Sequence, residues 1–347
     1  MNPILRVIEP GLATAVQDLG RTGYQRVGIP VSGALDAVAL RAANVVVGNA
    51  QHLAGLEMAL VGPTLEVEAT SVRIAVGGGR ATIDIGDGQT GVRRRVPALH
   101  SVTLRRGDRF RIGPIAGSAV AYLAVAGGLD LPPFLGSQST YVRGGFGGFQ
   151  GRALRKGDGV PLGRDAATER DELSLRDFDL SPATEIRVVL GPQDDWFTPE
   201  ATATFLDAPY TVTREADRMG LRLDGPRLVH AKGANIVSDG IAPGSVQVPG
   251  NGLPIVLLAD RQTTGGYPKI ATVISADLPI LGRVAPGAVL GFRAVTVEQA
   301  QAARVTLDKR LRELAKELVP VRAEGPDLAR LLEVNLISGV TDGDRVA

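Results

Sequence analysis

Short runs in which apolar and polar residues alternate recur along most of this chain and restrict the folds that it can adopt. Clear runs cover residues 63–69, 72–76, 81–85, 101–104, 108–112 and 119–125. Alternation with a period of two predicts β-strands, and strands spaced roughly ten residues apart with glycine-rich turns are typical of antiparallel barrels or sandwiches. The 44 glycines and 22 prolines among the 347 residues agree with many tight turns. We therefore expect a mainly β protein with a few helices.

A charged segment at 166–185 separates two regions that both contain such strand patterns. It is poor in aromatic residues and ends close to Ser181-Pro182, which is typical of a linker. Expected strands in the second region cover residues 186–190, 210–213, 221–223, 245–248, 255–259, 271–274 and 289–294. We predict one β domain over 1–165, a second over 186–296, and a C-terminal helix and tail over 297–347. A partial likeness between the two regions suggests an internal duplication.

Three segments carry the signals that begin and end helices. A helix over 35–47 would follow Ser32 as its N-cap. A short helix would begin at Thr198, because Pro199 suits the first helical position. A third helix is expected over 298–318, where leucines form one stripe. Since exposing this stripe would forgo its burial, we expect the helix to pack against a barrel or at an oligomer interface.

The charge balance and the composition exclude several classes of function. With 38 basic and 37 acidic residues the net charge is +1, so no overall field attracts nucleic acid or an anionic membrane. The chain has no cysteine, and its three histidines lack the spacing of metal ligands, so we expect neither disulfides nor a metal site. Glu9 and Asp18 interrupt the apolar stretch of a signal peptide, and the longest apolar run, 116–129, is too short to cross a bilayer. These features favour a cytoplasmic protein.

The densest group of chemically useful side chains lies in two loops that flank one predicted strand. The first loop carries Gln247 and Asn251, and the second runs from Asp260 to Lys269. Together they offer amides, hydroxyls, a carboxylate, a guanidinium and an amine, and two adjacent glycines permit backbone N–H groups to converge on an anion. The alternative is an ordinary hairpin whose polar side chains cap backbone groups. Since two polar loops border the same strand, we favour a binding site.

Other polar segments are less specific. Gln17, Asp18 and Arg21 lie among glycines near the N-terminus, and a turn held by an Asp18–Arg21 pair explains them equally well. Ser137 and Ser139 offer hydroxyls, but no histidine lies nearby in the sequence to activate them, so a hydrogen-bonded turn is the simpler interpretation. No glycine cluster matches a phosphate loop or a dinucleotide fingerprint, so we expect no nucleotide motif on this chain.

Motifs spread over residues 5–293 resemble one known family. They include Thr14–Gly23 (T-A-V-Q-D-L-G-R-T-G), Ser32–Asp36, Tyr122–Gly128, Gly136–Thr140, Lys156–Asp158, Asp217–Arg222 and Asp260–Pro268. In this order they are similar to the biotin-dependent carboxyltransferase / allophanate hydrolase subunit 2 family, whose bacterial members include the C subunit of 5-oxoprolinase. The resemblance is specific because no single motif carries it.

The resemblance implies a fold of two cyclophilin-like antiparallel β-barrel domains. It also implies a subunit of an ATP-dependent 5-oxoprolinase, which opens the lactam of 5-oxoproline to glutamate. The expected partners are a subunit 1-like protein, equivalent to the B subunit of 5-oxoprolinase, and a lactam-utilisation protein equivalent to its A subunit, and ATP would act through the complex. Two alternatives stay open: a component that moves a carboxyl group from carboxybiotin, carried on another chain, to urea or a related amide, and a non-catalytic antagonist of a kinase inhibitor.

If 5-oxoproline is the substrate, we expect the Asp260–Lys269 loop to form its pocket. Asp260 would act as a base or orient water, and Arg261 or Lys269 would hold the substrate carboxylate. The predicted catalytic residues are thus Asp260 and Lys269. The predicted binding residues are Gln247, Asn251, Arg261, Gln262, Thr263, Thr264, Gly265, Gly266 and Tyr267, and the secondary candidates are Gln17, Asp18, Arg21, Ser137, Ser139 and Arg218. Leu281-Gly-Arg283 stands where relatives usually carry a Gln, so a substrate contact from that position is in doubt.

Overall fold

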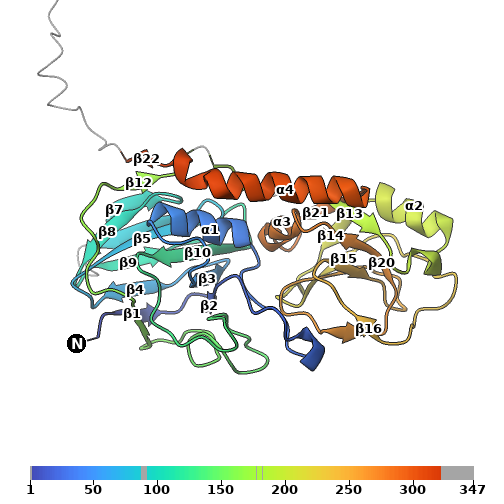
Figure 1. Ribbon diagram of the computed structural model, residues 1–347, viewed down its shortest axis with the longest axis horizontal. Helices are drawn as coiled ribbons and strands as arrows, with labels where there is room; N and C mark the ends of the chain where they lie inside the picture. Colours follow the sequence, from blue (N-terminus) through green and yellow to red (C-terminus); the bar gives the residue numbers. More distant parts are fainter. Residues whose placement is uncertain (1, 87–91, 177, 182, 322–347) are drawn as a thin grey trace, which may run out of the picture.

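The computed structural model describes residues 2–86, 92–176, 178–181 and 183–321. Within these ranges the chain forms two β units that lie side by side along the long axis of the molecule (Figure 1). We call them the N-terminal unit and the C-terminal barrel. The mainly β architecture expected from the sequence is confirmed. The end of the predicted tail, residues 322–347, lies outside the described residues.

The N-terminal unit consists of two antiparallel sheets around one core. The first sheet has the spatial order β11 (Gly159–Pro161), β1 (Ile4–Glu9), β4 (Thr64–Val67), β9 (Arg109–Ile112), β6 (Thr82–Gly86) and β7 (Val92–Pro97). The second has the order β2 (Ala13–Gln17), β3 (Gly55–Ala59), β10 (Val120–Val125), β5 (Ser71–Gly77) and β8 (Val102–Arg105). Inward-facing Leu5 and Leu65 from one sheet and Leu56 and Leu123 from the other are fully buried together.

The sequence did not predict β1, β2, β3, β7 or β11. The reason is clearest for β3, whose first four residues are all buried, so that it shows no alternation of apolar and polar positions. The six strands that were expected in this region are all present, with ends shifted by at most two residues.

The C-terminal unit is a closed barrel of seven strands. Around the barrel they follow the order β13 (Glu185–Leu190), β20 (Lys269–Val273), β17 (Ser245–Gln247), β18 (Ile255–Leu257), β15 (Gly220–Asp224), β14 (Tyr210–Val212) and β21 (Val289–Ala294). Six neighbouring pairs are antiparallel, as expected, but β13 and β21 run parallel. An odd number of strands cannot alternate in direction around a closed ring, so one parallel pair is required. Among the described residues, hydrogen bonding closes a barrel only in this unit.

The aromatic side chains of this barrel gather at one end of its core. Phe205 lies on α2 (Pro199–Asp207) and stacks on Phe292 of β21 with ring centroids 4.5 Å apart. Thr198 caps α2 through its side chain and Pro199 occupies the first turn, as the sequence predicts. A separate two-stranded ribbon, β16 (Asp239–Gly240) with β19 (Thr264–Gly265), extends one rim of the barrel.

Helix α1 (Ala37–Val46) packs on the N-terminal unit, but its N-cap differs from the prediction. The side chain of Asp36, not Ser32, accepts hydrogen bonds from the backbone N–H groups of Val38 and Ala39, both at 3.0 Å. Ser32 instead adopts a left-handed backbone conformation with φ of 53°, and its N–H donates to the carbonyl of Ala259 in the other unit. Ser32, which local rules assign to the N-cap of the helix, therefore contributes to the docking of the two units instead.

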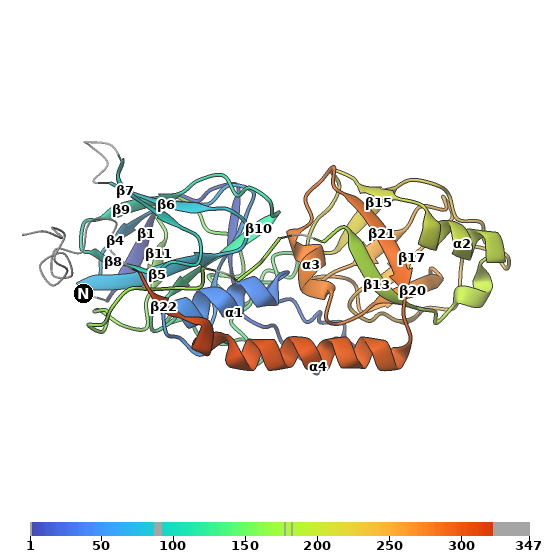
Figure 2. The same ribbon diagram turned by 90° about the horizontal axis from the view of Figure 1, so that it is seen from above.

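The C-terminal helix runs along both units (Figure 2). It comprises α4 (Val297–Glu313), begun by a capping box of Thr296 and Gln299, and a 3-10 turn over Leu314–Glu317. Leu311 and Leu314 are buried against α1 and the five-stranded sheet, so the leucine stripe is covered within the chain. The following strand β22 (Val319–Pro320) pairs with β12 (Leu173–Ser174), which joins the end of the C-terminal helix to the charged connecting segment. None of the described helices combines the length and apolarity that crossing a membrane requires.

Candidate functional site

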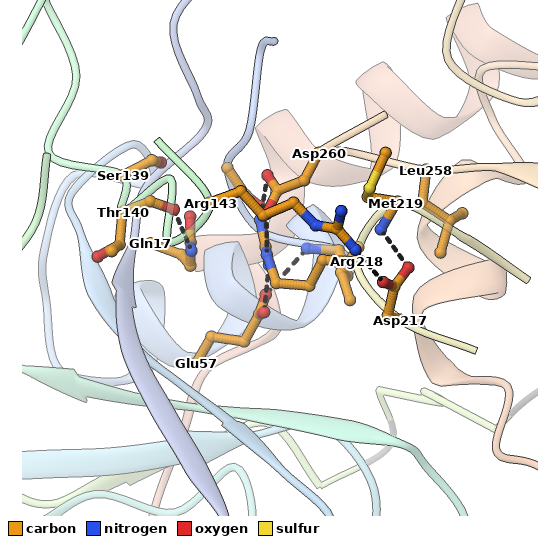
Figure 3. Close-up of polar contacts among 12 residues, drawn as sticks. Gln17, Glu57, Ser139, Thr140, Arg143, Asp217, Arg218, Met219, Leu258 and Asp260 are labelled. Carbon is orange, nitrogen blue, oxygen red and sulfur yellow. Dashed lines mark hydrogen bonds and ion pairs between the residues drawn. The ribbon is translucent and has the colours of Figure 1, made fainter. Parts of the chain in front are cut away.

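Arg218, which lies just before β15, joins the two units through a cluster of charges. Its Nε donates to Asp260 Oδ2 at 2.8 Å and its Nη2 to Asp260 Oδ1 at 3.2 Å, while Nη1 contacts Glu57 on β3 (Figure 3). Nη2 also donates to the carbonyl of Gly33 at 2.7 Å. Burial by itself would lower the pKa of the Arg218 guanidinium, but the carboxylates of Glu57 and Asp260 outweigh it and raise this pKa. The cluster thus holds one cation between two anions.

Glu57 is held in turn by the N-terminal unit. Its second oxygen, Oε2, accepts hydrogen bonds from the Tyr122 hydroxyl at 2.7 Å and from the N–H of Leu35 at 3.0 Å. Burial and the neighbouring carboxylates of Glu57 and Asp36 raise the pKa of the Tyr122 hydroxyl, so that it stays a donor. Every oxygen of Glu57 is therefore engaged.

A second ion pair between the units involves the position where this chain departs from the family pattern. Arg283, at the end of α3 (Leu278–Arg283), donates from Nε to Asp36 Oδ2 at 2.5 Å. Both side chains are buried. Arg283 therefore contributes to the contact between the units. Because its guanidinium is bound to Asp36, we assign it no contact with a substrate.

Asp260 belongs to this interface and not to an open pocket. Both of its oxygens accept from Arg218, and its side chain is only 7% exposed. A general base needs a free lone pair that faces the substrate. The geometry therefore argues against the predicted role of Asp260 as a base and gives it a structural one.

Four of the predicted binding residues line one groove at the mouth of the barrel. The groove has a volume of about 680 Å³ and includes Gln247, Asn251, Gln262 and Tyr267. Gln247 Nε2 donates to the Tyr267 carbonyl and Gln262 Nε2 donates to Gln247 Oε1, each at 3.3 Å. These distances are long for hydrogen bonds, so the amides are available to exchange partners. Gln262 is exposed, whereas Gln247 is only 2% exposed, so the groove presents the amide of Gln262, with Gln247 as its buried partner.

The N-terminal unit contributes to the rim of the same groove. Arg143 reaches across to Asp217, with 3.1 Å between Nη2 and Oδ2 (Figure 3). Asp217 also lines a smaller, mostly apolar pocket of about 290 Å³ between the units, together with Glu57, Arg218 and Leu258. Asp217 thus lines both hollows.

The predicted glycine turn does not have the backbone geometry expected for an anion site. Thr264 and Gly265 form β19, where Gly265 pairs with Asp239, and neither Gly265 nor Gly266 has a positive φ. The N–H groups of an extended strand alternate in direction, so they do not converge on one ion. Thr263 and Thr264 line a different hollow, on the side of residues 25–28.

The two predicted carboxylate-binding cations are both turned away from the groove. Lys269 is 2% exposed, and its Nζ donates to Asp239 at 2.9 Å. Arg261 is also 2% exposed and donates to the carbonyls of Ile241 at 3.1 Å and Leu258 at 3.2 Å. Burial lowers the pKa of the Arg261 guanidinium to about 10. Neither side chain lies where the predicted site needs it.

Among the secondary candidates, Asp18 is the centre of a hydrogen-bonded turn. It accepts from the hydroxyls of Ser137 at 2.7 Å and Ser139 at 2.5 Å, and from the N–H groups of Gly20 and Gln138, both at 2.7 Å. The structural interpretation of the two serines is therefore supported. The turn is held by these serines, however, and not by an Asp18–Arg21 pair.

Arg21 and Gln17 lie beside this turn and are buried. Arg21 donates from Nη2 to the Ser139 carbonyl and lies over the Phe146 ring, while Gln17 Nε2 donates to the Thr140 carbonyl at 3.0 Å. Burial lowers the pKa of the Arg21 guanidinium, although Asp18 and Asp260 oppose the effect. Within the described residues, Arg21 Nε and Nη1 and Gln17 Oε1 have no hydrogen-bond partner.

The sequence analysis missed Glu57, Tyr122, Arg143 and Asp217 as functional candidates. A signal was present for Glu57, because a lone carboxylate between apolar residues of a buried strand requires a partner. Asp217 begins one of the motifs that carry the family resemblance, but nothing local points to Arg143, and the proximity of the two depends on how the units dock. In the described part of the chain, no group of three or more His, Asp and Glu side chains is placed to hold a metal ion.

Comparisons with known proteins agree with this architecture. The carboxyltransferase domain family, subdomain A and B, matches residues 27–294. The chain is 38% identical over 317 residues to the C subunit of 5-oxoprolinase from Escherichia coli, a match that covers 91% of this chain and 99% of that protein. It is 31% identical over 363 residues to urea amidolyase of Saccharomyces cerevisiae, covering 96% of this chain and 19% of that protein.

A solved structure shows the same relationship. The Kluyveromyces lactis urea carboxylase superimposes with a TM-score of 0.82 at 29% identity, covering 93% of this chain and 30% of that one. The chain therefore corresponds to one part of the larger urea-metabolising proteins and to nearly the whole of the bacterial protein. It belongs to the carboxyltransferase domain family.

Proposed function

We propose that this chain is a subunit of a 5-oxoprolinase, which hydrolyses 5-oxoproline to glutamate together with partner subunits. The observation that carries the proposal is the 38% identity to the C subunit of the Escherichia coli 5-oxoprolinase over nearly the full length of both chains. The groove supports it, because the exposed amide of Gln262, which is hydrogen-bonded to Gln247, offers a donor and an acceptor that match those of a lactam. Hydrogen bonds to the lactam oxygen would also stabilise charge that develops there during attack.

The roles of the individual residues follow from their surroundings. Gln247, Gln262 and Tyr267 would contact the substrate, because they line the groove. Asp260, with Arg218, would position the two units, since its oxygens are already bound. Lys269 would hold the β16–β19 ribbon through Asp239.

ATP would bind to a partner. A phosphate loop joins a strand to the N-terminus of a helix. The glycine-rich turn at 144–148 lies among successive turns, and no described helix follows it before β11. We therefore propose no ATP-dependent step on this chain. We expect partners equivalent to the B and A subunits of 5-oxoprolinase to bind ATP.

A second candidate function is carboxyl transfer to urea or a related amide, with biotin carried on another chain. It is favoured by the superposition on the Kluyveromyces lactis urea carboxylase with a TM-score of 0.82. An amide-binding groove would suit urea as well as a lactam. The two candidates differ in the acceptor and in the need for biotin.

Reconstitution separates these candidates. The chain is purified alone and together with the products of its neighbouring genes, and 5-oxoproline-dependent ATP hydrolysis is measured. We expect activity from the complex and none from the isolated chain. Robust activity of the isolated chain would refute the need for partners, while urea-dependent, biotin-dependent carboxylation without 5-oxoproline hydrolysis would favour the second candidate.

A further inference from the structure

We propose that Arg143 recognises the carboxylate of the substrate, and that it does so by exchanging its contact with Asp217 for a contact with the substrate. This inference rests on the proposed function, because 5-oxoproline carries a carboxylate and urea does not. It assigns to the N-terminal unit a specificity residue in a groove that the barrel otherwise forms.

The position of Arg143 is the first argument. It lines the groove together with Gln247 and Gln262, although it belongs to the other unit. Figure 3 shows its side chain extended toward Asp217, beside Arg218. A carboxylate on Arg143 would thus lie in the polar groove beside Asp217, a residue that also lines the apolar pocket. A small ring with one charged group fits this combination of surfaces.

The weakness of its present ion pair is the second argument. The side chains of Arg143 and Asp217 are 62% and 49% exposed, and one nitrogen contacts one oxygen at 3.1 Å. Exposed pairs of this kind contribute little stability, so a ligand can replace one partner at small cost. A planar guanidinium also offers two parallel N–H groups, which bind a carboxylate better than this single contact does.

Elimination of the other cations is the third argument. Arg218 is saturated by two carboxylates, and Lys269 and Arg261 are directed to groups outside the groove. Arg222 is the one other cation lining the groove among the described residues, and its pair with Glu215 within the barrel, at 3.3 Å, is as weak as that of Arg143. Unlike Arg143, it does not face a partner that also lines the apolar pocket.

The test compares variants in the reconstituted complex, with kcat and KM measured for 5-oxoproline. Arg143→Gln should raise KM roughly 10- to 100-fold, the size expected for loss of a charge-assisted contact, with a smaller change in kcat. Arg222→Gln should raise KM less than Arg143→Gln does, and the matched exposed pair variant Arg293→Gln, whose partner is Glu185 away from the groove, should change KM less than about threefold.

Asp217→Asn separates recognition from a merely structural role. The variant keeps Oδ1, which accepts from the N–H groups of Met219 and Gly220, but removes the charge that competes for Arg143. If Arg143 binds substrate, this variant should lower KM, up to about fivefold. If the pair only holds the units together, both variants break it and should shift KM in the same direction, which would overturn the inference.

The remaining outcomes are also decisive. An active complex in which Arg143→Gln has the wild-type KM, or in which Arg222→Gln shows the large effect, overturns the inference and leaves the proposed function intact. A wild-type complex that carboxylates urea and does not hydrolyse 5-oxoproline overturns both.

Discussion

The interface between the units and the groove at the barrel mouth both take residues from the loop that follows β18, yet they differ in burial and in the strength of their polar contacts. At the interface, Asp260 and Glu57 are buried, and Arg218 forms an ion pair with each of them. In the groove, Gln262 and Arg143 are exposed and hold their partners through single or long contacts. Asp260 and Gln262 are only two positions apart in the sequence.

The difference teaches which polar residues to regard as functional. A buried charge whose hydrogen-bonding capacity is filled cannot take a new partner without a large cost. An amide or guanidinium that lines a groove and is weakly paired can take a new partner at little cost. Charge and sequence proximity alone favoured Asp260 and Lys269, whereas the degree of saturation favours Gln247, Gln262 and Arg143. Four predictions test this contrast, in order of decreasing effect.

Replacing Arg218 by Met should lower the free energy of unfolding by about 3 kcal/mol, because two buried carboxylates lose their common partner. Chemical denaturation of the purified chain measures this change. Arg143→Met, which breaks an exposed pair, is the matched control and should cost less than about 1 kcal/mol. Equal effects of the two variants would remove the distinction between interface and groove.

Asp260→Asn should lower the free energy of unfolding by about 2 kcal/mol, since a charge-assisted contact with Arg218 is weakened. The variant that remains folded should keep its kcat within about threefold of the wild type, because Asp260 takes no part in the chemistry. Steady-state kinetics on the reconstituted complex, corrected for the folded fraction, provide the measurement. A fall in kcat of about 100-fold or more would restore Asp260 as a general acid or base.

Gln262→Ala should leave the free energy of unfolding within about 0.5 kcal/mol of the wild type, because its side chain is exposed. It should nevertheless lower kcat/KM about tenfold, equivalent to about 1.4 kcal/mol, through loss of an amide contact with the substrate. Gln301→Ala on the exposed side of α4 is the control for activity. An unchanged kcat/KM for Gln262→Ala would mean that the groove is not the substrate site.

Glu172, in the connecting segment, is half-buried, so its burial is intermediate between that of the interface and that of the groove. Burial works to raise the pKa of its carboxyl, but hydrogen bonds from Ser101 and Thr103 and the charge of Arg73 outweigh it and hold this pKa below 4.5. A lowered folded pKa gives stability that is present above pH 4.5 and is lost as the pH falls through the folded value. Glu172→Gln should therefore reduce the acid dependence of unfolding, by at most about 1 kcal/mol. Identical pH profiles of the variant and the wild type would contradict this.

Local rules account for the elements and for few of the contacts. Period-two runs predicted most strands within two residues, and Thr198 and Pro199 predicted the start of α2. They failed at β3, where both faces are buried, and at Ser32, whose N–H donates to a carbonyl of the other unit instead of capping the helix. In the site, two polar loops around β18 predicted a groove, which the structure shows lined by Gln247 and Gln262 among others. Local rules could not show that the side chains of Asp260 and Lys269 pair with groups outside this groove.

By itself, the sequence determined most of the strands, many of the turns, the division into two regions and the resemblance to a family, because each depends on residues close together in the chain or on many independent motifs. Only the tertiary structure decided which polar groups meet. Arg218 and Glu57 are 161 positions apart, and Arg143 and Asp217 are 74 apart. The alternation of a strand specifies which residues share a face, but it does not specify what that face is packed against. The partner of each charge, and with it the distinction between a structural ion pair and a binding residue, was therefore fixed by the docking of the two units.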